Sequence, residues 1–188
     1  MTNRWQYEGI PGLIEPGRRH GLRKDATMLR FDNAETQAFW RDACAASHID
    51  PATTHHAGTF AEPSTPDRAA FIDVLSGMAR DGDKRGTAHM RLQFEQDGIP
   101  LRQTGDCWIV TTTVGEPLCV VRITGLAITP FDQVAETFAA SEGEGDLSVA
   151  HWRGAHIDYF KRQCQRWNQE WRDDRSIVCE SFELVYRP

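Results

Sequence analysis

The sequence lacks the short motifs that mark the common nucleotide-binding and hydrolytic enzyme families. It contains no Walker-type phosphate loop, no dinucleotide-binding GxGxxG, no GxSxG and no HExxH. Nucleoside triphosphate and dinucleotide chemistry therefore have no support. His48, His55 and His56 lie close together in the chain, but no Cys or acidic residue stands at the usual spacing of a zinc ligand. We expect no metal and no cofactor.

The chain also has no apolar run long enough to cross a bilayer, and its first residues show no apolar stretch behind a basic segment. We therefore expect no membrane span, no secretory signal and a cytoplasmic location. The five cysteines are odd in number and include no CxxC pair, which predicts reduced thiols in the core. With 188 residues, 40% of them hydrophobic and 26% charged, the chain has the composition of one globular domain.

Lysine and arginine are missing from residues 131–150, where five carboxylates gather. Residues 1–30 instead carry six basic and three acidic side chains. Because the formal net charge is -6, the whole molecule does not attract polyanions. Any affinity for nucleic acid must come from a local basic patch.

The spacing of apolar residues predicts helices before and between strands. Residues 1–33 show no clear period and are expected to form an N-terminal extension to a domain at 34–188. The predicted helices lie at 34–47, at 66–81 after Thr65, in a short segment that follows Thr129 and Pro130, and over about six turns from Ser148 through Trp171. The predicted strands lie at 88–94, 107–113, 118–128 and 176–186, with a loop at 48–66. This order favours an α+β fold with a curved antiparallel sheet or small barrel and helices outside it.

Lys84 and Thr87 form the first candidate site, in the segment GDKRGT at 82–87. An amine near a hydroxyl can act as base and nucleophile if burial lowers the pKa of the lysine. On a regular strand, however, side chains three residues apart point to opposite faces, so the backbone would have to bend at Gly86. The alternative is a polar turn with Lys84 in solvent, and spacing alone favours that alternative.

The second candidate is the acidic and glycine-rich segment at 142–146, EGEGD, which precedes a predicted helix. Its carboxylates could simply stabilise the N-terminus of that helix. Alternatively, crowded carboxylates could raise one another's pKa, so that one of them exchanges protons near neutral pH. The segment lacks the spacing of a calcium-binding EF-hand loop.

The third candidate combines rings and cations on the helix that follows, with Trp152, Arg153 and His156 among its members. Such a set could stack bases and hold phosphates. The same spacing is more often the buried side of an amphipathic helix, with the charges on its wet face. We therefore expect most of these aromatic rings to lie in the core, and His156 to be a hydrogen-bonded core histidine.

The order of these segments resembles that of ASCH-domain proteins in the PUA-like superfamily, over roughly residues 34–186. The segments that carry the resemblance are GDKRGT (82–87), TGDCWIV (104–110), EPLCVVRIT (116–124), the stretch from Phe131 to Phe160, and IVCESFELVY (177–186). The resemblance implies a small antiparallel β-barrel flanked by helices, with a cleft that binds RNA or a modified nucleoside. Because no run of the chain could cross a bilayer, we expect no membrane partner.

The resemblance also implies a site. Some proteins that resemble this chain hydrolyse the amide of acetylated cytidine with a Lys, a Thr three residues later and a Glu; the matching residues are Lys84, Thr87 and Glu142. Others bind or cleave RNA, and there Lys84 and Ser148 would be the candidates. The residues expected to contact RNA or nucleoside are Arg85, His89, Arg91, Trp152, Arg153 and His156. A hydrolase of an acylated nucleoside is the first expectation, and a non-catalytic RNA-binding module or a ribonuclease acting on single-stranded RNA is the alternative.

Overall fold

A five-stranded mixed sheet forms the centre of the computed structural model, which describes residues 30–188. The strands are β1 (His55–Gly58), β2 (Gly86–Met90), β3 (Cys107–Thr111), β4 (Pro117–Pro130) and β5 (Ser176–Tyr186), in the order β1-β3-β4-β5-β2. The helices are α1 (Ala34–Ser47), α2 (Pro66–Asp81), α3 (Arg91–Asp97), η1 (Phe131–Gln133), α4 (Glu136–Ser141) and α5 (Val149–Arg166). The α+β prediction is confirmed. The predicted extension at 1–33 remains a prediction, since residues 1–29 lie outside the described part.

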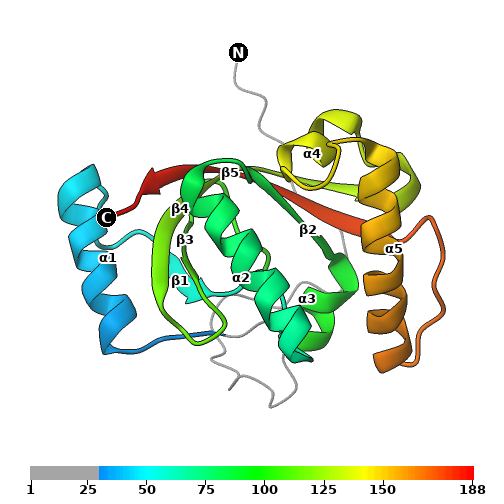
Figure 1. Cartoon of the computed structure of the whole chain (residues 1–188), viewed down its shortest axis with the longest axis horizontal. Coiled ribbons are helices and arrows are strands. Elements are labelled where there is room, and N and C mark those ends of the chain that lie inside the picture. Colours follow the sequence, from blue (N-terminus) through cyan, green and yellow to red (C-terminus); the bar gives the residue numbers. More distant parts are fainter. Residues whose placement is uncertain (1–29) are drawn as a thin grey trace, which may run out of the picture.

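Long strands curve the sheet around the molecule. β4 and β5 pair antiparallel from Val120 and Tyr186 to Pro130 and Ser176, and the register shifts twice along the way. Such irregularities bend a strand and increase its twist. Helix α2 covers the middle of the sheet, while α1 and α5 lie at its two ends (Figure 1). β1 is the exception to antiparallel pairing, because it runs parallel to β3.

Helix α2 begins and ends as the sequence predicts. The Thr65 side chain accepts a hydrogen bond from the amide of Arg68, and Pro66 occupies the first turn, where its missing N–H costs nothing. The helix ends at Gly82, whose φ of 101° is left-handed and favours glycine. The chain then turns directly into β2, so this helix end fixes where the residues before the strand lie.

The predicted strand at 88–94 is only partly correct. β2 ends at Met90, and Arg91–Asp97 form helix α3. The apolar alternation continues through Phe94, but a short helix also buries that side chain, with Gln93 beside it. The pairing partner β5 begins at Ser176, and its Ile177 lies opposite Met90, so the ladder ends with that partner. The alternation of apolar and polar residues alone does not show where the partner strand, and with it the predicted strand, ends.

Three further predictions of local structure differ from the structure. The stretch 48–66 contains β1, whose sequence His-His-Ala-Gly carries little intrinsic strand preference and is held by pairing with β3. Thr129 and Pro130 end β4 opposite Ile177 and Ser176, and only the short 3-10 helix η1 starts directly after them; the α-helix α4 starts later, at Glu136. α5 is also shorter than predicted and ends at Arg166.

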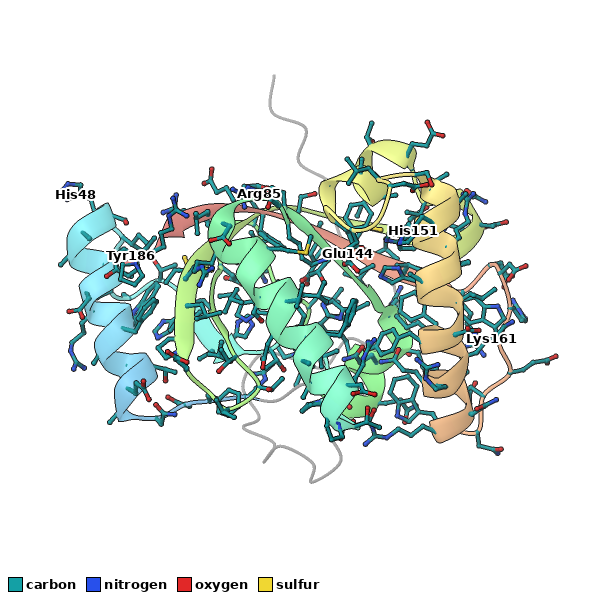
Figure 2. The ribbon with its side chains drawn as sticks, viewed as in Figure 1. His48, Arg85, Glu144, His151, Lys161 and Tyr186 are labelled. Atoms are coloured by element: carbon teal, nitrogen blue, oxygen red, sulfur yellow. The ribbon has the colours of Figure 1, made fainter. Side chains whose placement is uncertain are left out.

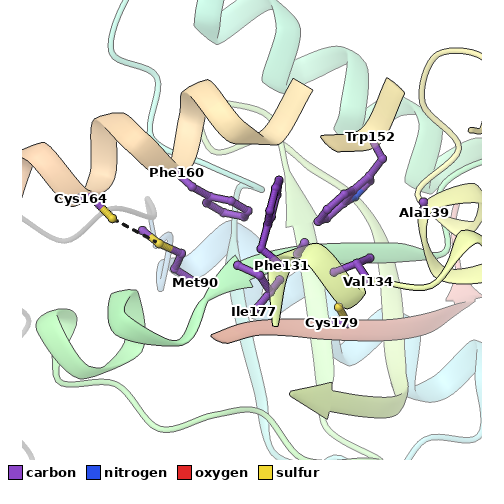
Figure 3. Packing of buried hydrophobic residues seen from close by; sticks show 10 residues of the cluster. Met90, Phe131, Val134, Ala139, Trp152, Phe160, Cys164, Ile177 and Cys179 are labelled. Carbon is purple, nitrogen blue, oxygen red and sulfur yellow. Dashed lines mark hydrogen bonds between the residues drawn. The ribbon is translucent and has the colours of Figure 1, made fainter. Parts of the chain in front are cut away.

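A hydrophobic cluster joins α5 to the outer face of β2 and β5 (Figure 3). Its buried members are Ala88, Met90, Phe131, Val134, Ala139, Trp152, Phe160, Cys164, Ile177 and Cys179. The thiol of Cys164 lies 3.8 Å from the sulfur of Met90. All five cysteines of the chain are buried and free, so the prediction of reduced core thiols is confirmed.

The position of this cluster also shows which side chains of β2 and β5 lie on the opposite face of the sheet. Successive side chains of a strand point to opposite faces. Because Ala88 and Met90 face α5, Thr87 and His89 must face the other side of the sheet. By the same alternation, Glu180 of β5 lies on the face opposite Cys179, and it pairs in register with Thr87. The inner face of the sheet thus presents polar side chains.

Candidate functional site

Lys84 lies in the turn between α2 and β2 and is completely buried. Its amide donates to the carbonyl of Met78 at 3.2 Å, which ties the turn to the end of α2. Its side chain is 1% exposed, so the alternative of a solvated lysine is wrong. β2 begins only at Gly86, and the alternation rule for strand side chains therefore does not restrict the direction of Lys84.

Two carboxylates surround the Lys84 ammonium group. Its Nζ donates to Oε2 of Glu142 at 2.8 Å and to Oε1 of Glu144 at 2.7 Å. The ring of Phe60 lies beneath it, with the centroid 5.3 Å from Nζ. Glu142 is as buried as the lysine, whereas the Glu144 side chain is 18% exposed. The two acidic residues therefore bind the same cation from different environments.

Close backbone packing holds the acidic loop against the turn that carries Lys84. Gly143 has a φ of 76°, and a Cβ at this position would lie 2.4 Å from the carbonyl oxygen of Asp83. The amide of Arg85 donates to the carbonyl of Ser141 at 2.7 Å. A Cβ on Gly86 would lie 2.6 Å from Oγ of Ser141. Glycine is thus required at 143, and the absence of a side chain at 86 leaves room for the Ser141 hydroxyl, at the contact that brings residues 84 and 142 together.

Trp152 holds the second oxygen of Glu142. Its indole Nε1 donates to Oε1 of that carboxylate at 2.7 Å. His156 stacks on the indole with a centroid separation of 4.3 Å, and its Nε2 lies 3.8 Å from the same oxygen. Nδ1 of His156 lies 2.9 Å from the carbonyl oxygen of Trp152. The predicted pair Trp152 and His156 therefore supports the carboxylate, and the buried indole has no open face for a base.

The ionic network sets the protonation of both partners. Burial acts to raise the pKa of the Glu142 carboxyl, but Lys84, His156 and the hydrogen bond from Trp152 lower it to about 2. Burial acts to lower the pKa of Lys84, but Glu142 and Glu144 raise it above its ordinary value. Both groups are therefore charged at neutral pH. The hypotheses of a carboxyl with a raised pKa and of an amine neutralised by burial are both wrong for this state.

The rest of the acidic loop builds the start of α5. The Ser148 hydroxyl accepts a hydrogen bond from the amide of His151 at 3.1 Å, which caps the helix. Asp146 accepts from the amide of Ser148 at 2.9 Å. Figure 2 shows Glu144 close to the end of α5 at which His151 lies. The segment EGEGD therefore has two roles. Residues 142 and 144 bind Lys84, and residue 146 stabilises the start of α5.

Thr87 and His89 lie on β2, on the inner face of the sheet, and follow Lys84 in the chain. Both side chains are buried, and Thr87 lies opposite Glu180 in the antiparallel register. Nε2 of His89 lies 3.9 Å from Oε2 of Glu180, and an edge-to-face contact joins its ring to Phe94. Arg102 donates to the same oxygen of Glu180. A second buried polar cluster therefore begins two residues beyond Thr87.

The three arginines predicted to contact RNA or nucleoside bind groups of this chain. Arg85 donates to the carbonyl of Lys84 at 3.0 Å, Arg91 lies 3.2 Å from Glu95, and Arg153 donates to the carbonyl of Asp132 at 2.9 Å. Arg153 also lines a surface cavity of about 360 Å³ with Phe131, Asp132, Gly154, Ile157 and Asp173. The three arginines therefore lie on separate elements, β2, α3 and α5, or directly beside them.

The described residues offer few sites for other chemistry. Within residues 30–188, no group of three His, Cys, Asp or Glu side chains is placed to hold a metal ion. Among the same residues, no helix has the length and apolarity needed to span a bilayer.

Comparison with known proteins identifies the family. The family model of the ASCH domain matches residues 64–186. The chain belongs to the ASCH-domain family. Its fold is similar to the crystal structure of an ASCH domain from Lactobacillus crispatus, with a TM-score of 0.74 and 30% identity over 85% of this chain and 100% of that one. The crystal structure of a protein from Enterococcus faecalis gives a TM-score of 0.67 and 23% identity over 80% and 92%. No curated protein matches the chain.

Three residues of this ASCH domain were missed as site candidates. Glu144 lies in the segment that the sequence singled out, and its alternation with Glu142 could have indicated a shared cation. Glu180 interrupts an apolar strand, and a charge between Val178 and Phe182 on one strand face is a recognisable sign of a buried polar site. Phe60 gave no signal, because its stretch was predicted to be a loop.

Proposed function

We propose that this ASCH-domain protein hydrolyses the amide of an acylated nucleoside. The observation that carries the proposal is the buried ion pair of Lys84 with Glu142, at the two positions where the family resemblance expects a catalytic amine and carboxylate. Burying two charges costs several kcal/mol each before their attraction is counted. A fold that needed only packing could place apolar side chains here, so a functional reason for the pair is favoured.

A small neutral substrate fits the charges around this site better than a long RNA. Glu142 and Glu144 come within hydrogen-bonding distance of Lys84 and leave it no excess positive charge to offer a phosphate. Further carboxylates in residues 131–150 would repel a polyphosphate chain. An acylated nucleoside carries no charge on its reacting amide.

Thr87 is the proposed nucleophile. Its hydroxyl oxygen bonds to the acyl carbon, its proton passes to Lys84 and on to the departing nitrogen as the carbon–nitrogen bond breaks, and a water then releases the acid from the threonine ester. Because the two carboxylates keep Lys84 protonated, the amine becomes a base only after one of them withdraws. Glu144 is the one that can, since it is partly exposed and lies between two glycines. Glu142 stays and orients the amine.

Release of acetate from acetylcytidine tests the proposal. Thr87→Val keeps the shape of the side chain and removes the hydroxyl, so it is expected to abolish release while the melting temperature stays within a few degrees of the wild type. Thr87→Ser is the matched control and should retain part of the activity. Full activity in Thr87→Val would end the assignment. Lys84→Ala is less useful, because it leaves two carboxylates buried without their cation.

The alternative function is an RNA-binding module or a ribonuclease, with Lys84 and Ser148 as the candidates for cleavage. It predicts affinity for single-stranded RNA that falls steeply with salt, by a log–log slope of about -0.7 for each phosphate contact. Binding of RNA with that slope, together with no release of acetate from acetylcytidine, would favour it over amide hydrolysis.

A further inference from the structure

The second polar cluster on the inner face of β2 and β5 is incompletely hydrogen-bonded. Among the residues that the structure describes, neither ring nitrogen of His89 has a hydrogen-bond partner, and its side chain is 1% exposed. Within the same part of the chain, Oε1 of Glu180 also lacks a partner, on a side chain that is fully buried. Native proteins satisfy most buried polar groups, since an unpaired one costs the whole loss of its hydration.

Other contacts show that these atoms are held in place rather than misplaced by loose packing. Arg102 binds the other oxygen of Glu180, and Phe94 contacts the edge of the His89 ring at a centroid distance of 5.6 Å. The two strands pair in a regular antiparallel ladder at the edge of the sheet, with His89 opposite Val178. Three buried polar atoms therefore remain available on a rigid part of the sheet.

We propose that His89 and Glu180 form a subsite that recognises the hydrogen-bonding edge of the nucleobase in the substrate. The inference rests on the proposed hydrolase and names the part of the substrate that this face reads. The sequence placed His89 only among general contacts to RNA or nucleoside, and it did not single out Glu180.

The donors and acceptors of the two side chains define the ligand class. Burial, opposed in part by Glu180, lowers the pKa of His89 to about 4, so at neutral pH the ring offers one N–H donor and one acceptor. A carboxylate oxygen only accepts. The complementary ligand presents an N–H beside an acceptor, which is what an acylated amino group next to a ring nitrogen of a cytosine provides.

The position of the subsite relative to Thr87 agrees with that substrate. Residues two apart on a strand lie on one face and are separated by roughly 6.6 Å. Thr87 and His89 have this relation, and Glu180 lies across the ladder from Thr87. An amide carbon at Thr87 and a base edge at His89 would thus belong to one substituted ring.

A variant of His89 without ring nitrogens distinguishes a role in substrate binding from a role in the stability of the fold. His89→Phe keeps an aromatic ring against Phe94 and removes both unpaired nitrogens. We expect the KM for acetylcytidine to rise at least about tenfold, the value of one lost hydrogen bond in a dry site, with kcat changed much less. The melting temperature should stay equal or rise, whereas a structural role predicts a fall. His55→Phe on β1, at the other edge of the sheet, is the matched control and should leave the KM unchanged; it loses a hydrogen bond to the carbonyl of Thr53, so its melting temperature should fall.

Binding of acetylcytidine by the full chain, measured by calorimetry, separates this inference from the proposed function. If the wild type releases acetate and His89→Phe has an unchanged KM, the subsite is overturned and the hydrolase stands. If the wild type binds acetylcytidine without releasing acetate and His89→Phe loses that binding, the subsite stands and the hydrolase fails. If the wild type neither binds nor hydrolyses acetylcytidine, both are overturned.

Discussion

Two buried polar clusters lie on neighbouring parts of this domain, and they differ in how well their charges are paired. In the cluster of Lys84, Glu142 and Glu144, the amine has two carboxylate partners and both oxygens of Glu142 are bound. In the cluster of His89 and Glu180, three buried atoms have no partner among the described residues. The network in the turn and loop before β2 is therefore saturated, and the one on β2 and β5 is unsaturated.

The difference separates what each cluster contributes to the fold. A saturated buried ion pair is strongly destabilising to break, although its net gain over apolar packing is small. An unsaturated cluster lowers stability in every state that lacks a ligand, because its atoms have lost water and gained nothing. Substitutions should therefore damage the first cluster and leave the second as stable or more stable.

Breaking the saturated cluster should give the largest effect on stability. Glu142→Gln leaves the Lys84 ammonium buried with only the partly exposed Glu144 as counter-charge. We expect the free energy of unfolding to fall by about 3–5 kcal/mol, measured by urea denaturation at pH 7.

A double variant controls for lost packing at the same place. Lys84→Met with Glu142→Leu removes both charges and keeps side chains of similar size, so it should recover part of the loss. A change below about 1 kcal/mol in Glu142→Gln would show that the pair is solvated and that the comparison between the clusters is wrong.

The two clusters should lose stability in different pH windows. The pKa of His89 is lowered from 6.5 to about 4, and that of Glu142 from 4.5 to about 2. For each group the unfolded chain takes up a proton first as the pH falls. The contribution of His89 is therefore complete above pH 6.5 and is lost towards pH 4, while that of Glu142 is lost between about pH 4.5 and 2.

Urea denaturation at a series of pH values measures how the free energy of unfolding declines in the pH range of His89. His89→Phe should remove a decline of about 3 kcal/mol between pH 6.5 and 4, from the shift in pKa. Part of the decline remains, since burial also lowers the pKa of His56 well below 6.5. The charged groups that act on His89 are Glu180, Arg102, Glu142 and Lys84. An unchanged pH dependence in His89→Phe would mean that the ring is hydrated.

The sequence predicts an element well where the residues that start and end it lie within or next to that element. Helix α2 is recognisable from Thr65, Pro66 and Gly82, because a cap, a proline and a left-handed glycine act within a few residues. β1 and the end of β2 are not, because pairing with a distant strand decides both. A histidine pair followed by Ala and Gly becomes a strand only when β3 lies beside it.

The candidate site was predictable as a set of residue types and not as a set of contacts. Lys84 and Glu142 are 58 positions apart, and they meet because Gly143 packs against the backbone of Asp83 and Gly86 packs against the side chain of Ser141. The protonation of the pair could not be foreseen either, since burial alone would lower the pKa of the lysine and its two carboxylate partners reverse that.

The smallest expected effect on stability concerns Glu144, the exposed member of the saturated cluster. Glu144→Gln removes one of two counter-charges from Lys84 at a side chain that water still reaches, so the free energy of unfolding should change by less than about 1 kcal/mol. Asp146→Asn is the matched control, because it removes a carboxylate of the same loop that binds the Ser148 amide and not the lysine.

The same substitution should have a clear effect on the pH dependence of hydrolysis. Glu144 is one of the groups that raise the pKa of Lys84, so its loss lets burial lower that pKa. If Lys84 must be neutral to activate Thr87, acetate release rises with pH through the pKa of the amine, and Glu144→Gln moves this rise to lower pH. Asp146→Asn should leave the profile in place. A profile that moves to higher pH, or does not move, would show that Lys84 acts as an ammonium group, stabilising charge on the acyl oxygen, and that another group takes the proton.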